Sequence, residues 1–378
     1  KSKIAEELLE TRANLFGKFK GGLGFTVIIV GALLAASTGI VGATVIAMGL
    51  ISLPIMLERN YDQSLASGTI CATGTLGQII PPSIALVLLG DVLSGANQQA
   101  QIDMGNLSGK TVSVGDLFMG AVIPGLILVV AYCAYVLIKA YSSPSSVPIQ
   151  KTKIIQNKWK IIFTTLAPPL VLIISVLGSI LAGIATPTEA AGVGSLGALF
   201  LAASNQSLNK KNLTEAVETT TEITAMVFMI LLGSSIFSLV FRGFGGDDLV
   251  AGIFAQMPGG IFGAMMVVMI MVFLLGFILD FIQITFVVVP IVGPVLLSMG
   301  IDPVWLGIMI AINLQTSFLT PPFGFALFYL RGVAPESLPT SAIYRGVIPF
   351  IIIQIAVLFS LALFPEIVTY LPGVIYGN

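Results

Sequence analysis

Two pairs of adjacent prolines stand in apolar runs that are long enough to cross a membrane. Pro81–Pro82 follows GTLGQII, and Pro321–Pro322 follows TSFLT. A proline removes a backbone N–H donor, and its ring clashes with the carbonyl four residues earlier, so a helix must open at or before each pair. Opening a helix inside a bilayer frees carbonyls where water is scarce, and a bound cation is one way to satisfy them.

Small oxygen-bearing side chains lie just upstream of both proline pairs. Hard cations such as sodium take oxygen ligands, so both regions are candidate sodium sites. The alternative is that the prolines only kink a helix and that the hydroxyls bond back to its backbone. The side chains are Thr73, Thr75 and Gln78 before the first pair, and Asn313, Gln315, Thr316, Ser317 and Thr320 before the second.

Two further apolar stretches, 22–58 and 262–298, are 37 residues long each. A straight helix of that length would measure roughly 55 Å against a hydrocarbon core of about 30 Å, which is too long for one crossing and short for two. Each stretch is interrupted midway, by ASTGIVGAT at 36–44 and by GFILDFIQIT at 276–285. We predict two re-entrant helical hairpins whose tips lie at membrane depth.

Both predicted tips carry small or polar residues, and the second carries a carboxylate. Asp280 stands in the middle of an apolar run, where an ionisable group is a functional hypothesis by default. The alternative is a helix cap that bonds local N–H groups. The tip residues are Ser37, Thr38, Gly39, Gly42 and Thr44 in the first hairpin, and Asp280, Gln283 and Thr285 in the second.

The composition requires a membrane around these elements. The 378 residues are 56% hydrophobic and only 9% charged, whereas a soluble domain carries roughly a quarter charged residues. The chain has no histidine, which removes the commonest metal ligand and proton shuttle. Cys71 and Cys133 lie in apolar segments and read as small hydrophobes rather than as a disulfide. We predict an all-α polytopic membrane protein with no transition metal and no nucleic-acid partner.

The distribution of basic residues predicts on which side of the membrane each loop lies. The basic residues cluster at 1–20, at 139–160 and at Lys210–Lys211, and basic loops are cytoplasmic. All three clusters fall on one side if 22–58 enters and leaves the membrane by the same face. The polar loop 91–115 then lies outside. The remaining predicted spans are 64–90, 116–138, 161–183, 187–203, 217–240, 303–330 and 346–370.

The chain repeats itself. A shift of 240 residues superposes Pro54 on Pro294, Asp62 on Asp302 and the first proline pair on the second, and a shift of 225 superposes AVIPGLILVVA (121–131) on GVIPFIIIQIA (346–356). Each half reads hairpin, broken helix, helix, and the two hairpins enter from opposite faces. Such inverted repeats are typical of secondary transporters, which bind their solute near the midplane. The predicted parts are an amphipathic cytoplasmic helix (1–21), a first repeat (22–138), a basic cytoplasmic loop (139–160), scaffold helices (161–261) and a second repeat (262–378).

Two other motifs have a structural interpretation as well as a functional one. In GIATPTEAAGVG (183–194), Thr186, Pro187 and Glu189 fit the first positions of a helix with a capping box, and a role at a domain hinge is the alternative. Arg331 ends a spanning segment, so it is expected to reach the cytoplasmic face. A contact with a solute carboxylate is the alternative for Arg331.

These motifs, in this order and spacing, resemble the large membrane subunit of tripartite ATP-independent periplasmic (TRAP) transporters over nearly the whole chain. The resemblance implies a prokaryotic inner-membrane permease that works with a small four-helix membrane subunit and a periplasmic binding protein. It implies sodium-driven import of an organic acid, such as a C4-dicarboxylate or sialic acid, by an elevator mechanism. It also implies further helices before Lys1.

Carried over by position, the resemblance implies two groups of site residues. The ion-binding residues would be Ser37, Thr38, Gly39, Thr73, Gly74, Thr75, Gly276, Asp280, Asn313, Thr316 and Thr320. The solute-binding residues would be Thr44, Gln78, Gln283, Ser317 and Arg331. Ile40, Val41 and Gly42 stand where the family often has polar tip residues, so the solute preference does not carry over simply.

Other functions fit the sequence less well. The alternative to sodium-driven import is a proton-coupled or uncoupled organic-anion transporter or channel of similar hairpin architecture. Channels, however, show rings of repeated filter residues instead of paired hairpins. An intramembrane enzyme is disfavoured because the chain has no HExxH motif, no Ser–His pair and no nucleotide loop. We expect sodium as the coupling ion and no other cofactor.

Overall fold

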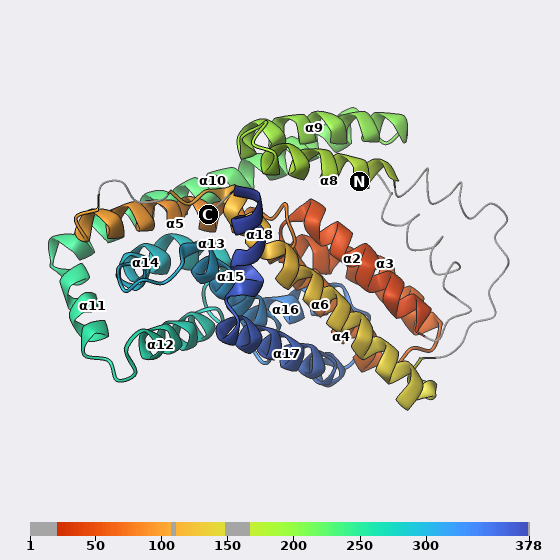
Figure 1. Cartoon of the computed structure of the whole chain (residues 1–378). Helices are drawn as coiled ribbons and strands as arrows, with labels where there is room; N and C mark the ends of the chain where they lie inside the picture. Colours follow the sequence, from red (N-terminus) through yellow and green to blue (C-terminus); the bar gives the residue numbers. More distant parts are fainter. Residues whose placement is uncertain (1–20, 107–110, 148–166, 377–378) are drawn as a thin grey trace.

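A computed structural model describes residues 21–106, 111–147 and 167–376, and every regular element within them is helical (Figure 1). The predicted helix over 1–21 and most of the basic loop 139–160 lie outside the described residues. The all-α class is therefore confirmed. Within the described residues, five helices are long and apolar enough to cross a membrane.

The first repeat begins with two helices joined by a two-residue break. The elements are α2 (Gly22–Thr38), α3 (Val41–Glu58), α4 (Gln63–Thr75), a short 3₁₀ helix η1 (Leu76–Gln78), α5 (Ile84–Asp103) and α6 (Val114–Ser142). The helix does open before the first proline pair, because α4 and η1 end at Gln78 and α5 begins only after Pro82.

The prediction of a polar loop over 91–115 is wrong for most of its length, because α5 continues to Asp103. Leu89, Leu93, Ala96 and Ala100 are buried at helical spacing. The polar residues of this segment include good helix formers such as Gln. The high polarity of residues 91–103 therefore gave no sign of the helix, which buries only one of its faces.

The middle of the chain forms an arm of exposed helices. Its elements are α8 (Ala167–Leu181), α9 (Pro187–Ser204), α10 (Lys210–Gly243) and α11 (Gly246–Ala255). The α8–α9 pair lies apart from the body in Figure 1. α10 is 34 residues long and carries large exposed apolar side chains, including Phe228 and Leu239. Such a surface needs lipid or protein cover.

The second repeat has the same order of elements as the first: a hairpin, a helix that ends at a proline pair, and further helices. Its elements are α12 (Gly260–Leu275), α13 (Phe281–Gln283), a π-helical turn η4 (Ile284–Val288), α14 (Val289–Ser298), α15 (Pro303–Leu319), α16 (Phe325–Val333), α17 (Thr340–Leu363) and α18 (Glu366–Tyr376). The single helix predicted over 346–370 is in fact two, since Phe364 and Pro365 separate α17 from α18. Pro365 cannot donate the amide that would continue α17.

The two repeats share local detail. Asp62 and Asp302, 240 residues apart, are the N-cap residues of α4 and α15, and their Oδ1 atoms accept bonds from Leu65 N (2.9 Å) and Trp305 N (2.8 Å). The Pro81–Pro82 and Pro321–Pro322 peptide bonds are both cis. The inverted-repeat interpretation rests on this correspondence as well as on the sequence shift.

The repeats also exchange packing partners. α3, from the first hairpin, packs against α16, and α14, from the second hairpin, packs against α5. Glycines allow the close approach: a Cβ on Gly49 would lie 2.7 Å from Val333 Cγ2, and one on Gly293 would lie 3.2 Å from Ala96 Cβ. Each hairpin therefore lies on the helix that follows the proline break of the other repeat.

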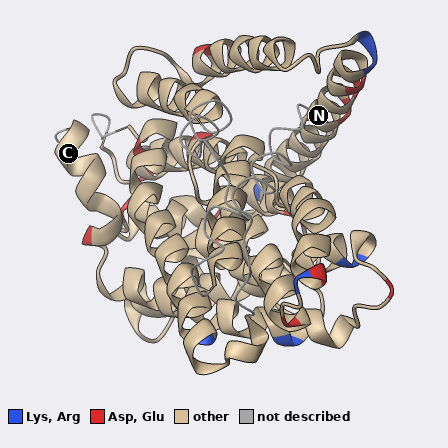
Figure 2. Ribbon diagram, turned by 90° about the vertical axis from the view of Figure 1, so that its right-hand side faces the viewer, with Lys and Arg blue, Asp and Glu red and all other residues tan. Residues whose placement is uncertain are grey.

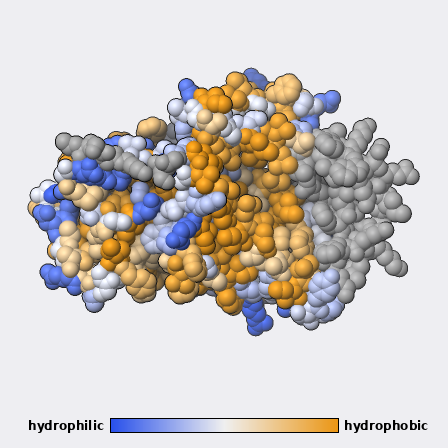
Figure 3. Space-filling model, in the orientation of Figure 1, coloured by the Kyte–Doolittle hydropathy of each residue, from blue (hydrophilic) through white to orange (hydrophobic). Residues whose placement is uncertain are grey.

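The surface fits a bilayer. Figure 3 shows apolar residues over much of the visible face, with hydrophilic patches near its edges. Figure 2 shows Lys, Arg, Asp and Glu mainly at helix ends and in connections. Leu126, Val130 and Phe359 are each at least 60% exposed on α6 and α17, as expected of lipid-facing helices.

Candidate ion and solute site

The tip of the first hairpin is held by hydroxyl groups. Gly39 has a φ of 63°, in the left-handed region that favours glycine, and it ends α2. Thr38 Oγ1 lies 2.5 Å from Thr44 Oγ1, which in turn donates to the Ile40 carbonyl at 3.0 Å. Ser37 is exposed and donates to the Leu34 carbonyl. The threonine pair ties the two arms of the tip together.

The first tip lies against the first proline break. A Cβ on Gly39 would lie 3.0 Å from the backbone N of Ile84, the first residue of α5. On the other side of the break, a Cβ on Gly77 would lie 3.2 Å from the Ala35 carbonyl oxygen. The structure therefore brings the first predicted tip and the first predicted break together.

The threonines of α4 donate to their own helix. Thr73 Oγ1 donates to the Thr69 carbonyl at 2.6 Å, and Thr75 Oγ1 donates to the Ala72 carbonyl at 2.8 Å. These bonds match the structural alternative for the hydroxyls. They use the hydroxyl hydrogens and leave oxygen lone pairs, which are what a cation needs. Gly74 serves packing as well, because its Cβ would lie 2.3 Å from Val45 Cγ2.

The second hairpin is held against its broken helix in a similar way. Asn313 Nδ2 donates to the Met269 carbonyl and Ser317 Oγ to the Phe273 carbonyl, both at 2.7 Å. A Cβ on Gly276 would lie 2.6 Å from Ser317 Oγ. α12 and α15 are thus joined along one face. Thr316 and Thr320 donate to the carbonyls four residues earlier.

Asp280 is the N-cap residue of α13, and its backbone N donates to Gln283 Oε1 at 3.0 Å. The half-buried carboxylate lies within electrostatic range of Tyr329 on α16. Its position is compatible with both sequence hypotheses, a cap and an ion ligand.

Several buried polar atoms near the breaks have no partner within the described residues. They are Gln78 Oε1, Thr285 Oγ1 and both amide atoms of Gln315. Thr285 is fully buried and belongs to the π-helical turn behind the second tip, and such turns are frequent at functional sites. An unsatisfied buried polar atom costs about 1–3 kcal/mol, so small polar ligands or water are expected there.

A polar cluster that we did not predict joins the two repeats. Gln354 Nε2 donates to Tyr132 OH at 2.7 Å and to Thr75 Oγ1 at 3.3 Å. Gln315 also lies beside the Tyr132 hydroxyl, and Gln315 is the residue that a 240-residue shift superposes on Thr75. The available signal was Gln354 itself, the one amide in an apolar helix segment.

Three of the singled-out residues form their recorded hydrogen bonds with residues outside the predicted sites. Arg331 donates through Nη1 to the Leu338 carbonyl, in the connection that leads to α17. Thr186 Oγ1 receives the Glu189 amide at 3.3 Å, and Glu189 Oε2 accepts from Thr186 N at 2.8 Å, which is the geometry of a capping box. None of these three contacts a predicted ion-binding residue through a hydrogen bond that the structure records among its described residues.

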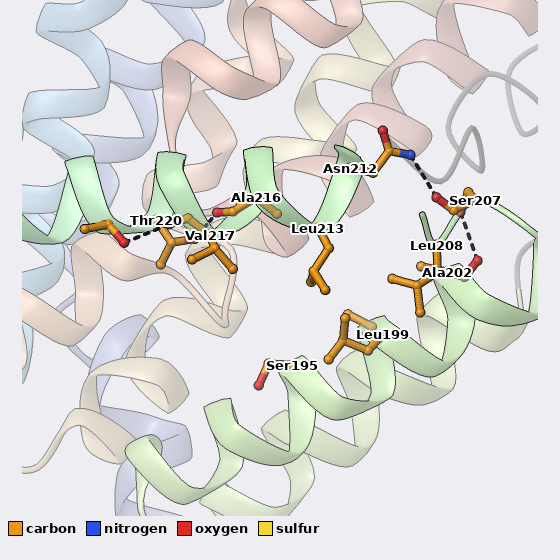
Figure 4. Close-up of a pocket in the computed structure, with 12 residues that line it drawn as sticks. Ser195, Leu199, Ala202, Ser207, Leu208, Asn212, Leu213, Ala216, Val217 and Thr220 are labelled. Atoms are coloured by element: carbon orange, nitrogen blue, oxygen red, sulfur yellow. Dashed lines mark hydrogen bonds between the residues drawn. The ribbon is translucent and has the colours of Figure 1, made fainter. Parts of the chain in front are cut away.

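A separate groove of 490 Å³ lies between α9 and α10 (Figure 4). Its lining is largely apolar, with Leu199, Leu213 and Val217 facing one another. These helices carry none of the predicted ion or solute residues. Across the described residues, no three His, Cys, Asp or Glu side chains gather into a metal-binding group.

Comparison with known proteins gives a consistent result. Residues 1–367 match the family described as the tripartite ATP-independent periplasmic transporter, DctM component. The C4-dicarboxylate TRAP transporter large permease DctM of Rhodobacter capsulatus is 28% identical over 98% of this chain and 83% of its own length. The sialic acid TRAP transporter large permease SiaM of Vibrio cholerae is 28% identical over 99% of this chain and 82% of its own.

A solved structure is similar in fold. The YdaH transporter of Alcanivorax borkumensis superposes with a TM-score of 0.62, covering 97% of this chain and 85% of its own, at 14% sequence identity. At that identity the likeness concerns the fold alone.

Proposed function

Because the chain belongs to the DctM component family of TRAP transporters, we propose that it uses a sodium gradient to import an organic anion. Its coarser identity follows from the family: it is a large permease subunit, a multi-pass inner-membrane protein, and not an enzyme. One observation carries the finer proposal. In both repeats a polar hairpin tip lies beside a helix that prolines have opened.

Sodium fits the chemistry of these two regions. Hydroxyl, amide and carbonyl oxygens predominate, and the neutral groups cannot change charge at physiological pH. Pro81 and Pro322 each leave the carbonyl four residues earlier, of Gly77 and Phe318, without its helical amide donor. Oxygen ligands of this kind suit a hard monovalent cation. Asp280 would add one formal charge to the second region.

The driving force is sufficient. Moving one charge through a potential of 100 mV yields about 2.3 kcal/mol. Two sodium ions entering with a monovalent anion, or three with a divalent anion, carry one net positive charge and would gain that energy. In the elevator scheme, the hairpins and broken helices move together as the solute-carrying part against the arm formed by α8 to α11.

Relatives and charge both favour a carboxylate-bearing solute. Two of the relatives are named for C4-dicarboxylate and sialic acid transport, and both solutes carry carboxylates. The N-terminus of α3, at Val41, opens beside the first tip. Helix N-termini favour anionic groups. We therefore assign a carboxylate-bearing solute to the first tip.

Two partners complete the proposal. The family name describes a tripartite transporter, so we propose that a small membrane subunit and a periplasmic binding protein work with this chain. The exposed apolar side chains of α10 offer the small subunit a surface within the membrane.

The test is uptake into proteoliposomes that contain the chain, the small subunit and the binding protein. We expect accumulation of a carboxylate only with an inward sodium gradient. Replacing that gradient with a proton gradient separates the proton-coupled alternative, and uptake that persists without sodium removes the coupling proposal.

Two substitutions test the ion sites. Asp280→Asn and Thr316→Ala should raise the sodium concentration for half-maximal uptake about tenfold, equivalent to about 1.4 kcal/mol, and leave folding intact. Gly95→Ala is the control, since nothing lies within 4 Å of the added methyl group. Unchanged sodium dependence in both variants would mean that the ion sites are misplaced.

A further inference from the structure

Tyr329 on α16 lies against the tip of the first hairpin, and it is not among the residues that the sequence pattern predicts. The hydroxyl end of its ring covers Gly42, in the first turn of α3: a Cβ on Gly42 would lie 2.9 Å from Tyr329 Cζ. A side chain of the second repeat therefore reaches the tip of the first.

The ring of Tyr329 can lie this close to α3 because Gly42 has no side chain. Only a residue without a side chain leaves room for the ring, because ring atoms Cε2 and Cε1 would also lie 3.1 and 3.2 Å from a Cβ at this position. The tyrosine therefore brings, from the other repeat, a hydroxyl to a position of the first tip that has no side chain of its own.

The hydroxyl of Tyr329 is free to bind a solute. Among the described residues it makes no recorded hydrogen bond, and the side chain is 38% exposed. Its counterpart in the first repeat, 240 residues earlier, is Leu89, which is fully buried.

We infer that Tyr329 contacts the solute and helps set which anion the permease accepts, its hydroxyl donating a hydrogen bond to the solute carboxylate. The inference rests on the proposed transport function and deepens it by naming a residue. A phenol donates to a carboxylate through a charge-assisted bond, which is stronger than a neutral one. The N-terminus of α3, which begins at Val41 beside Gly42, would favour the same anion.

The first test is kinetic. Succinate and sialic acid are screened as labelled solutes, and the one that the wild-type complex accumulates in proteoliposomes is used. Tyr329→Phe removes only the hydroxyl, and we expect its uptake KM to rise about 10- to 100-fold, the usual range for losing a bond to a charged group. The sodium concentration for half-maximal uptake should change less than twofold. An unchanged KM in Tyr329→Phe overturns the inference.

The second test is independent of turnover. Tyr329→Cys and the control Phe328→Cys, in a background in which Cys133 is replaced by serine, are labelled with a sulfonate methanethiosulfonate reagent. Phe328 is a 55% exposed neighbour on the same helix, while Cys71 is fully buried. The transported solute should slow the labelling of Tyr329→Cys at least about fivefold and leave Phe328→Cys unchanged; equal rates with and without solute overturn the inference.

The two proposals fail separately. If the wild type accumulates solute without a sodium gradient, the coupling proposal is lost, but the KM ratio of wild type to Tyr329→Phe still decides the role of Tyr329. If uptake requires sodium and that ratio is one, the coupling proposal stands and the assignment of Tyr329 is wrong.

Discussion

Gly276→Ala tests whether the second hairpin tip and α15 form one ion-binding unit. The new Cβ would lie 2.6 Å from Ser317 Oγ and 2.9 Å from Ser317 Cβ. Ser317 cannot simply turn away, because its hydroxyl is bonded to the Phe273 carbonyl at 2.7 Å. The added methyl group must therefore either break that bond or move α12 away from α15.

The magnitude follows from these two terms. Overpacking a well-packed contact costs typically about 1–3 kcal/mol, and losing a hydrogen bond costs about 1 kcal/mol net. We expect the free energy of unfolding to fall by about 2–4 kcal/mol. If the tip and α15 bind one sodium ion together, the sodium concentration for half-maximal uptake should rise at least about tenfold.

The assay is thermal unfolding of the purified protein in detergent, paired with sodium titration of uptake. Gly95→Ala is the matched control, because its Cβ meets nothing within 4 Å and alanine favours a helix by up to about 1 kcal/mol. Gly276→Ala combined with Ser317→Gly removes both clashing atoms and should recover part of the lost stability. Wild-type sodium dependence in a destabilised Gly276→Ala protein would refute the shared site.

Three further predictions concern the framework. Gly68→Ala would place a Cβ 2.0 Å from the Gly346 carbonyl oxygen, and no side chain can move aside to make room. We therefore expect the free energy of unfolding to fall by more than about 3 kcal/mol, or no folded protein at all. A melting temperature equal to that of the wild type would contradict the close crossing of α4 and α17. Gln354→Leu should leave the Tyr132 hydroxyl without its amide partner and lower stability by about 1–3 kcal/mol, measured by the same unfolding assay. Asp62→Ala removes the N-cap of α4 and should cost about 1 kcal/mol, whereas an unchanged melting temperature would show that the cap is energetically silent.

Much of the fold followed from local chemistry. Prolines cannot continue a helix, so the breaks at 81–82 and 321–322 were predictable to within a few residues. The hairpins followed from length, and the breaks in the structure fall at Gly39–Ile40 and between Leu275 and Phe281, inside the interruptions that the sequence marks.

The misses have physical causes. The polar composition of 91–115 predicts a loop, but Leu93, Ala96 and Ala100 recur at helical spacing and are buried, so the second half of α5 lies there instead. Tyr329 and Gln354 are single residues in apolar helices, and only the folded structure reveals that one reaches the first tip and the other joins the two repeats. Such contacts link positions far apart in the sequence, which neither propensity nor periodicity records.

The exchanged packing of the repeats has a consequence for synthesis. Residues of α3 such as Gly49 find their partners on α16 only after the ribosome has produced residue 333. Until then the first half must wait in the membrane with its small-residue surfaces uncovered, so neither half is a folding unit on its own. Chains halted before α16 should accordingly be cleared by membrane proteases, however complete their earlier helices are.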